Sequence, residues 1–344
     1  MRAPAFMFSV VVSSLVAVAP AMADCAYDAK TTGLSRIVAV DSTEGPIYGR
    51  ILNTKTLDAQ TRTVALRDKE VILTFDDGPL PPHTTTILDA LDRHCVKATF
   101  FSVGRMAASN ARTLKDINAR GHTIGTHTWS HPRAMDVMAP EDIKHEIEMG
   151  FAAVSNALGK PIAPFFRFPG LRDSEAGVGY LASRNISTWS VDVVSGDTDP
   201  GATSEKIAID TMARIRRLGR GIILFHDIKK TTADAIDTIL YALRAEGFKV
   251  VHVVSNTSYQ PDAQFFAEAE ARSLARRSFT GQFVRSEQPI SDGQVDYMHT
   301  EWIDLQKVSA ASREAEAQSV ADLSRLQGQQ LPGTVTIGAK PSVR

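Results

Sequence analysis

The chain has 344 residues, of which 43% are hydrophobic and 22% charged, as in an ordinary soluble globular protein. The formal net charge of −1 excludes the strongly basic balance of a general nucleic-acid or membrane-surface binder. The length is sufficient for one to two domains with a sizeable core.

Residues 1–23 differ in composition from the rest of the chain. Arg2 provides a positive start, residues 6–19 are apolar apart from serines, and residues 21–23 read Ala-Met-Ala, a small-x-small cleavage pattern. These features predict a signal peptide, export to the periplasm or the extracellular space, and no stable membrane insertion. The alternative is an uncleaved anchor, although the apolar run is shorter than the about 20 residues that a span requires.

Cys25 and Cys95 are the two cysteines. In an oxidising compartment they would form a disulfide that ties the N-terminal arm to the core. The alternative is two free thiols, one buried and one exposed. Both alternatives stay open at this level.

Secondary structure is expected in three parts. An arm over residues 24–68 contains short β-like pieces at 37–40 and 63–66. A domain over residues 69–254 alternates strands and helices. A polar extension over residues 255–344 has helix-compatible composition at 263–277 and 303–326, and its end is expected to be disordered.

The alternation in the central domain predicts an α/β fold. We expect strands over residues 71–75, 98–103, 122–125, 165–168, 186–194, 222–225 and 248–253, and helices over 83–94, 105–120, 140–158, 174–184, 203–218 and 231–246. Strands and helices of these lengths predict a mostly parallel sheet with helices outside it. About seven β/α units would close, or nearly close, as a barrel, although periodicity alone does not separate a distorted barrel from an open sheet.

Polar residues follow the expected strands at their C-terminal ends, the face on which β/α barrels carry active sites. They are Asp76, Asp77, His127, His131, Arg167, Asp192, Asp197, His226 and Asp227. A shared position on one face predicts that these side chains form a single site.

The stretch GTHTWSHP, residues 125–132, holds two histidines four residues apart. His127 and His131 can reach one ion from a tight loop, and Asp77 can add a carboxylate oxygen. Two histidines and one carboxylate, with open positions, are typical of a catalytic metal site. Zinc is the expected ion, with cobalt, manganese and iron(II) as alternatives. Taken alone, the histidine pair is also compatible with ordinary loop residues.

The stretch TFDDGP, residues 74–79, places two carboxylates side by side. If one binds the metal, the other can act as a general base on water. Taken alone, the same residues are typical of a simple turn. His226, in the stretch ILFHD, is a candidate general acid, and a core histidine is its alternative. Arg167 leaves an apolar strand and needs a carboxylate partner, for which Asp76 is the candidate. The Gly170 N–H is a candidate donor to an oxyanion.

Together these stretches resemble the polysaccharide deacetylase family, the NodB-homology domain of carbohydrate esterase family 4. The resemblance covers residues 69–254 and rests on TFDDGP (74–79), HTWSHP (127–132), RFPG (167–170) and LFHD (224–227). The fourth family motif departs, because WSVDVVSGDTDPG (189–201) lacks the usual Asp-Trp pair. Asp197 is its best counterpart and Asp192 the second candidate.

The resemblance implies a distorted (β/α) barrel of the NodB and glycoside hydrolase/deacetylase type. It implies Asp76 as the base, Asp77, His127 and His131 as metal ligands, Arg167 as the partner of Asp76, His226 as the acid, Asp197 as the partner of His226, and Leu224 as a wall of the acetyl pocket. Trp129, between the metal histidines, would either stack on a sugar ring or pack against the barrel.

The implied activity is removal of acetyl groups from an acetylated polysaccharide or oligosaccharide, with release of acetate. Candidate substrates are peptidoglycan, chitin oligomers, another N-acetylated polysaccharide and O-acetylated xylan. The rivals are a hydrolase of another non-peptide amide and a catalytically inert, metal-containing protein that binds glycans. The first rival class is usually cytoplasmic, which the signal peptide argues against, and the second is expected to lack a motif residue.

Overall fold

The computed structural model describes residues 33–45, 47 and 64–283. The chain divides after Gly281 into two units, and the described elements belong to the first of them, with α8 (Ala263–Phe283) reaching just past the division. The predicted signal peptide, Cys25 and the helix expected over 303–326 lie outside the described residues. The pairing of Cys25 with Cys95 therefore stays a prediction.

Within the described residues, nine strands form one sheet in which all strand pairs are parallel. The strands are β1 (Leu34–Val40), β2 (Glu70–Asp76), β3 (Thr99–Ser102), β4 (Thr123–Thr126), β5 (Phe165–Phe166), β6 (Ser187–Thr188), β7 (Val193–Val194), β8 (Gly221–His226) and β9 (Lys249–Ser255). Their pairings run from β2 through β3, β4 and β5 to β6, and from β7 through β8 back to β2. β6 and β7 do not pair with each other, but they follow one another on a single segment that joins the two ends of this path, and the predicted distorted barrel is confirmed.

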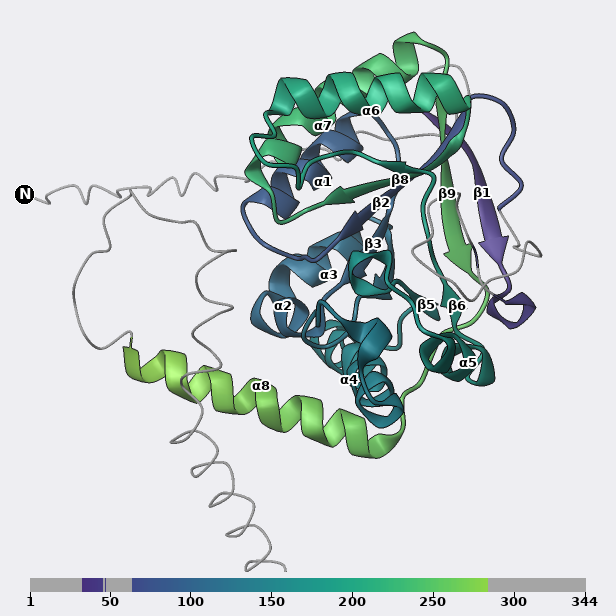
Figure 1. Ribbon diagram of the computed structural model, residues 1–344. Coiled ribbons are helices and arrows are strands. Elements are labelled where there is room, and N and C mark those ends of the chain that lie inside the picture. Colours follow the sequence, from purple (N-terminus) through teal and green to yellow (C-terminus); the bar gives the residue numbers. More distant parts are fainter. Residues whose placement is uncertain (1–32, 46, 48–63, 284–344) are drawn as a thin grey trace, which may run out of the picture. The chain divides into compact units, whose positions relative to one another are not determined.

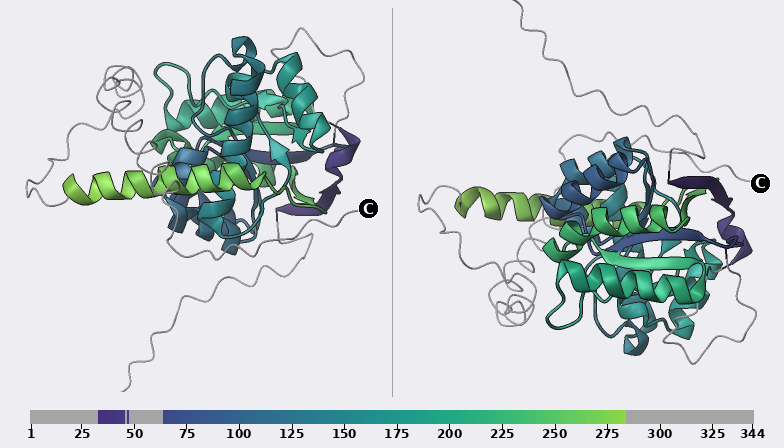
Figure 2. Two further views of the ribbon diagram at one scale, coloured as in Figure 1. Left: turned by 90° about the horizontal axis from the view of Figure 1, so that it is seen from below. Right: turned by 90° about the horizontal axis from the view of Figure 1, so that it is seen from above.

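The helices surround the strands (Figure 1). They are α1 (His83–Arg93), α2 (Gly104–Ser109), α3 (Ala111–Ala119), α4 (Pro140–Leu158), α5 (Glu175–Ser183), α6 (Ser204–Leu218), α7 (Lys230–Ala245) and α8. The views in Figure 2 agree with Figure 1 that α8 lies across the outside of α4. Among the described residues, every helix is too short or too polar to cross a lipid bilayer.

The two faces of the strands belong to different parts of the core. On β2, Leu73 and Phe75 belong to the large cluster that the strands form with the surrounding helices. Ile72 belongs to a second, smaller cluster together with Leu224 of β8 and Trp189. Because successive side chains on a strand point to opposite faces, Thr74 and Asp76 share the face of Ile72. This alternation directs Asp76 to the inner side of the barrel.

The N-terminal arm joins the sheet at its edge. β1 pairs with β9 over the register Leu34–Val250 to Val40–Ser255, so the expected strand at 37–40 is present and longer than expected. The expected strand at 63–66 is wrong for its described part, because residues 64–66 form no strand. Val64 and Leu66 instead pack against the smaller cluster as an irregular segment.

Two further expectations are corrected. The helix expected over 105–120 is two helices, because Asn110, with φ −123° and ψ 42°, interrupts it. The strand expected over 186–194 is two short strands, β6 pairing with β5 and β7 with β8. The segment therefore pairs first with β5 and then with β8, instead of forming one continuous strand.

The extension expected from residue 255 begins inside the compact unit. Tyr259 is buried, its N–H donates to the carbonyl of Ile162 at 2.9 Å, and α8 packs on α4 through Phe265 and Ala269. The boundary expected at 254–255 is thus not a break in the packing.

Candidate active site

The turn after β2 separates the two adjacent carboxylates. Asp76 is the last residue of the strand, faces inwards and is 2% exposed. Asp77 adopts a φ of +81°, a conformation that non-glycine residues rarely take. Strained backbone of this kind persists where the surrounding structure over-determines it, often at functional sites. The turn sends the Asp77 side chain to His127 and His131, while Asp76 turns to Arg167.

Asp77, His127 and His131 form a cluster that is suited to a metal ion. One ligand atom from each lies within 4.8 Å of the others. Asp77 Oδ1 is 3.6 Å from His127 Nε2 and 3.3 Å from His131 Nε2. Asp77 Oδ1 is buried and has no hydrogen-bond partner among the described residues. A buried carboxylate oxygen without a donor normally has an unseen partner, and a divalent cation held by two imidazoles fits it.

The tautomer of His127 is fixed by its neighbour. His127 Nδ1 lies 2.7 Å from the carbonyl oxygen of Arg167. A carbonyl only accepts, so Nδ1–H donates and the Nε2 lone pair faces Asp77. Burial lowers the pKa of His127 to about 4, against the opposing effect of Asp76. His127 is therefore neutral near pH 7, as a metal ligand must be.

Arg167 joins the strand ends inside the barrel. Its Nη1 donates to Asp76 Oδ1 at 2.7 Å and to Thr74 Oγ1 at 2.8 Å, and the side chain is fully buried. The guanidinium lies 4.2 Å from the centroid of the Phe101 ring, which positions it by stacking. Because Oδ1 of Asp76 is occupied in this way, Oδ2 remains, 3.8 Å from His127 Nε2.

His226 lies beside Asp76 and is held by Asp197. The two strands β2 and β8 bring Asp76 and His226 into direct register. The ring nitrogen Nδ1 of His226 is 2.9 Å from Asp197 Oδ1. The backbone N–H of His226 donates to Asp197 Oδ2 at 2.7 Å. Thr232 Oγ1 donates to the same Oδ2 at 2.8 Å. Burial opposes the charge on the imidazole, but Asp197 outweighs it and raises the pKa of His226 to about 10. His226 is therefore protonated at neutral pH.

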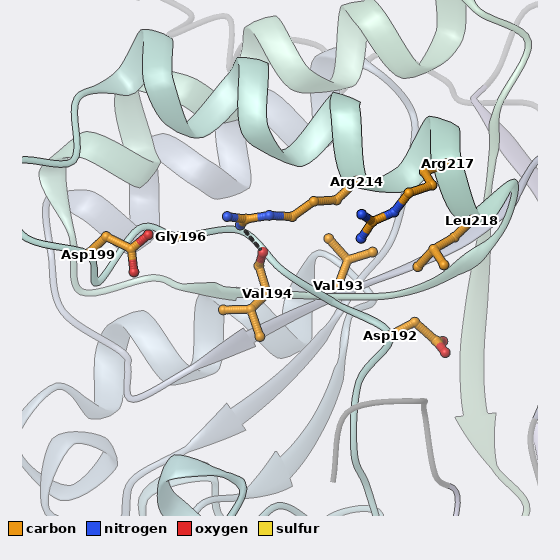
Figure 3. A pocket seen from close by; sticks show the side chains of 8 residues that line it. All are labelled: Asp192, Val193, Val194, Gly196, Asp199, Arg214, Arg217 and Leu218. Atoms are coloured by element: carbon orange, nitrogen blue, oxygen red, sulfur yellow. Dashed lines mark hydrogen bonds between the residues drawn. The ribbon is translucent and has the colours of Figure 1, made fainter. Parts of the chain in front are cut away.

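The second candidate for this role, Asp192, lies elsewhere. Its Oδ2 accepts from the N–H of Ile222 at 2.8 Å, and it lines a surface cleft with Arg214 and Arg217 (Figure 3). None of the residues that line this cleft is Asp76, His226 or a member of the metal cluster. The structure thus brings Asp197, and not Asp192, to the imidazole of His226.

The three expected substrate-pocket residues have different surroundings. Leu224 is buried on β8 and shares the inner face with His226, two residues further along the strand. Gly170 is exposed in the turn Pro169–Leu171 after β5, with a φ of +62°. Trp129 is 4% exposed and packs against α4 and α8. Of its two alternatives, this packing favours the structural one over sugar stacking.

Asp227 is a residue of the site that motif spacing did not single out for a role. Its carboxylate accepts from the Gly78 N–H and from Thr84 Oγ1, both at 2.8 Å. A Cβ atom at Gly78 would lie 2.0 Å from Asp227 Oδ2, which explains the glycine after the two aspartates. Burial raises the pKa of Asp227 to about 7. The signal was available in LFHD, where a second polar residue follows His226 in an otherwise apolar stretch.

Comparisons with known proteins point to one family. The profile of the polysaccharide deacetylase family matches residues 63–186. The peptidoglycan-N-acetylglucosamine deacetylase PgdA of Listeria monocytogenes is 30% identical over 213 residues, which are 61% of this chain and 44% of the relative. The peptidoglycan-N-acetylglucosamine deacetylase of Bacillus cereus is 33% identical over 192 residues, which are 54% of this chain and 67% of the relative.

Among solved structures, the Bdellovibrio bacteriovorus peptidoglycan deacetylase Bd3279 aligns with a TM-score of 0.57 and 28% identity, over 66% of this chain and 61% of that one. The chain spans less than half of the length of the Listeria relative. The family profile covers β2 to β5, which carry Asp76, Asp77, His127 and His131, and the Bacillus relative is covered over two thirds of its length. On this combined evidence the chain belongs to the polysaccharide deacetylase family.

Proposed function

We propose that the protein is a metal-dependent hydrolase that removes N-acetyl groups from a cell-envelope or extracellular polysaccharide and releases acetate. One juxtaposition supports this most strongly. The carboxylate of Asp76 and the imidazole of His226 are register partners on β2 and β8, and His127 Nε2 of the metal cluster lies 3.8 Å from Asp76 Oδ2. The residues that we propose as the base, the acid and the metal ligands are thus grouped at one end of the barrel.

Asp77, His127 and His131 would hold the metal ion, for which we propose zinc, with cobalt, manganese and iron(II) as alternatives. When bound there, the ion would polarise the acetyl carbonyl and lower the pKa of water.

Asp76 is the proposed general base. Its Oδ2 takes the proton of the attacking water, because Oδ1 is held by Arg167. Arg167 also compensates the buried negative charge of Asp76, so the carboxylate keeps one orientation as the proton arrives. Water adds to the carbonyl carbon, and the N–H of Gly170 is the proposed donor to the oxygen that gains negative charge.

His226 is the proposed general acid. Because Nδ1–H is held by Asp197, Nε2–H is the proton that can be donated to the amine nitrogen as the C–N bond breaks. The products are acetate and the free amine of the sugar. Leu224, on the same face of β8 as His226, is proposed to contact the acetyl methyl group.

The proposed substrates are N-acetylated envelope glycans, above all peptidoglycan, with chitin oligomers next. Two observations support this choice. The relatives described above are named as peptidoglycan deacetylases. The predicted signal peptide at residues 1–23 would export the chain to the periplasm or the extracellular space, where such glycans are found.

Acetate release tests the proposal. Zinc-loaded protein is incubated with peptidoglycan, N-acetylglucosamine oligomers and O-acetylated xylan, with and without a chelator, and with Asp76→Asn as the matched control. We expect release from an N-acetylated glycan that the chelator abolishes, and a loss of about 10²–10⁴-fold in Asp76→Asn. Retention of bound glycan without acetate release from any substrate would contradict the enzyme and favour a glycan-binding protein.

A further inference from the structure

The loop that carries both metal histidines has strained backbone. Between His127 and His131, the residue Thr128 has a φ of +72°, and His131 itself has a φ of +58°. Neither residue is glycine, and such conformations are retained only where the surrounding structure holds them. The contacts around residues 127–131 therefore decide how well the two imidazoles are placed.

One set of contacts comes from the start of α2. The N–H of Gly104 donates to the carbonyl of Thr128 at 2.9 Å, and the N–H of Arg105 donates to the carbonyl of Trp129 at 3.0 Å. The approach is close, because a Cβ atom at Gly104 would lie 2.8 Å from Cε3 of Trp129. The helix start thus holds the loop by its backbone.

A second set comes from Glu146 of α4. Its backbone carbonyl accepts from the N–H of Trp129 at 2.9 Å. Its carboxylate accepts from the N–H of Ser130 at 2.8 Å and from Ser130 Oγ at 2.7 Å. Backbone groups of Thr128, Trp129 and Ser130 are therefore bound to α2 and α4, whereas the indole N–H of Trp129 has no hydrogen-bond partner among the described residues.

On its outer side the loop packs against α8 through Trp129. The indole of Trp129 forms a separate apolar cluster with residues of α4 and α8, namely Met149, Ala152, Ala153, Phe265 and Ala269. Ala269 is fully buried, and the guanidinium of Arg272 lies 5.9 Å from the centroid of a Trp129 ring. Phe266 contributes a carbonyl that accepts from Asn156 Nδ2 of α4 at 3.0 Å.

A polar contact adds to this attachment. Glu268 of α8 lies 3.0 Å from His145 Nε2 of α4 and accepts from Arg272 at 2.7 Å. These groups are part-exposed, so the apolar contacts on Trp129 are the larger stabilising contribution.

We propose that α8 is a positioning element for the metal site. By packing on Trp129 it holds the strained loop in the conformation that directs His127 and His131 towards Asp77. The indole is the link, since it lies between the two histidines in the chain and against α8 in space. This inference rests on the proposed metal-ligand roles of the three residues, and it assigns a task to a helix that begins beyond the family profile at residues 63–186.

The test uses the full chain and two matched substitutions in one helix. Ala269→Asp places a charge in the buried contact with Trp129, and Ala267→Asp places the same charge on the exposed side of α8. Trp129→Ala and the double variant Trp129→Ala/Ala269→Asp complete a double-mutant cycle with Ala269→Asp and the wild type. Zinc affinity is measured by competition with a chromophoric chelator, and the visible spectrum of the cobalt(II)-loaded protein reports ligand geometry. Circular dichroism verifies that each variant is folded, and Phe265→Ala is the milder replacement if Ala269→Asp does not fold.

We expect a zinc dissociation constant about 10-fold or more higher for Ala269→Asp and for Trp129→Ala, with an altered cobalt spectrum, as for other losses of support around metal ligands. Ala267→Asp should stay within about twofold of the wild type. The double variant should bind zinc no more weakly than the weaker-binding single variant, because both changes remove the same support of the loop.

Three results would overturn the proposal. They are wild-type affinity in both single variants, weakening in Trp129→Ala alone, and fully additive effects in the double variant. The wild-type protein and His127→Ala are measured in the same assay. If zinc binds the wild type no better than His127→Ala, the metal assignment fails, which is a different outcome from failure of the role of α8.

Discussion

Replacing Asp197 by asparagine is expected to move the alkaline limb of the pH–rate profile towards acid. The amide is of nearly the same size, and its oxygen can still accept a hydrogen bond from His226. The substitution therefore removes the negative charge and keeps one acceptor for the imidazole Nδ1–H, while the amide NH2 replaces the oxygen that accepts from the backbone N–H of His226 and from Thr232 Oγ1. In the proposed mechanism the active form has protonated His226, so activity is expected below the pKa of this group and is expected to be lost as the pH rises through it.

The size of the shift follows from the surroundings of His226. Burial would lower its pKa, and Asp197, with smaller contributions from Asp77 and Asp76, raises it from 6.5 to about 10. At 1.36 kcal/mol per pKa unit, this change corresponds to about 5 kcal/mol in favour of the charged form. Loss of the nearest carboxylate is expected to lower the pKa by about two, within the 1–3 that an adjacent opposite charge contributes.

The assay is kcat/KM for acetate release between about pH 6 and pH 11, since this ratio reports the pKa values of the free enzyme. Zinc content is measured at each pH, so that loss of metal is not mistaken for loss of the acid. We expect the alkaline limb of Asp197→Asn about two pH units below that of the wild type. A limb at the same pH in both proteins would refute the assignment of His226 as the acid that Asp197 keeps protonated.

Three stability changes are expected, each measured by urea unfolding of metal-free protein. Arg167→Met should destabilise the fold by about 3–5 kcal/mol, because it leaves Asp76 as an unpaired buried charge; a loss below about 1 kcal/mol would show that the pair is not buried as described. Gly78→Ala should cost about 1–3 kcal/mol, since the new methyl group collides with the carboxylate of Asp227. Wild-type stability of Gly78→Ala would mean that the carboxylate of Asp227 does not lie against Gly78. Ser174→Ala should cost about 1 kcal/mol, because Ser174 Oγ accepts from the Gly177 N–H and caps α5. An unchanged unfolding midpoint would rule out that cap.

Helices with clear end signals could be predicted closely. The expected helix at 140–158 agrees with α4, because Pro140 starts it and Gly159 ends it with a φ of +84°. α6 begins after Thr203, whose side chain caps Lys206 N–H, and ends before Gly219. In both helices the residues at the two ends specify where the helix begins and where it ends, so no tertiary contact was needed to locate them.

Boundaries that depend on distant partners could not be predicted. Asn110 interrupts the helix expected over 105–120, and its Nδ2 donates to the carbonyl of Pro79 in the turn after β2 at 2.9 Å. The segment 187–194 pairs first with β5 and then with β8, because it closes the barrel. Helix and strand periodicity carry no information on either contact.

In the candidate site, too, the features that depend on local sequence could be predicted, and those that depend on distant contacts could not. Asp76, Asp77, His127 and His131 could be grouped from their positions after strands, because parallel strands bring these ends together. The partner of His226 could not be chosen between Asp192 and Asp197, since both lie in the stretch 189–201 and only the three-dimensional path of the chain separates them. The packing of Trp129 depends on α8, which lies more than a hundred residues further along the chain.

The central claim is that one divalent ion is held by Asp77, His127 and His131. Anomalous scattering at the zinc edge from crystals of the zinc-loaded protein locates the ion directly. We expect a single strong peak about 2.0–2.2 Å from Asp77 Oδ1, His127 Nε2 and His131 Nε2. Zinc bound at other residues, or crystals that take up none at these three, would contradict it.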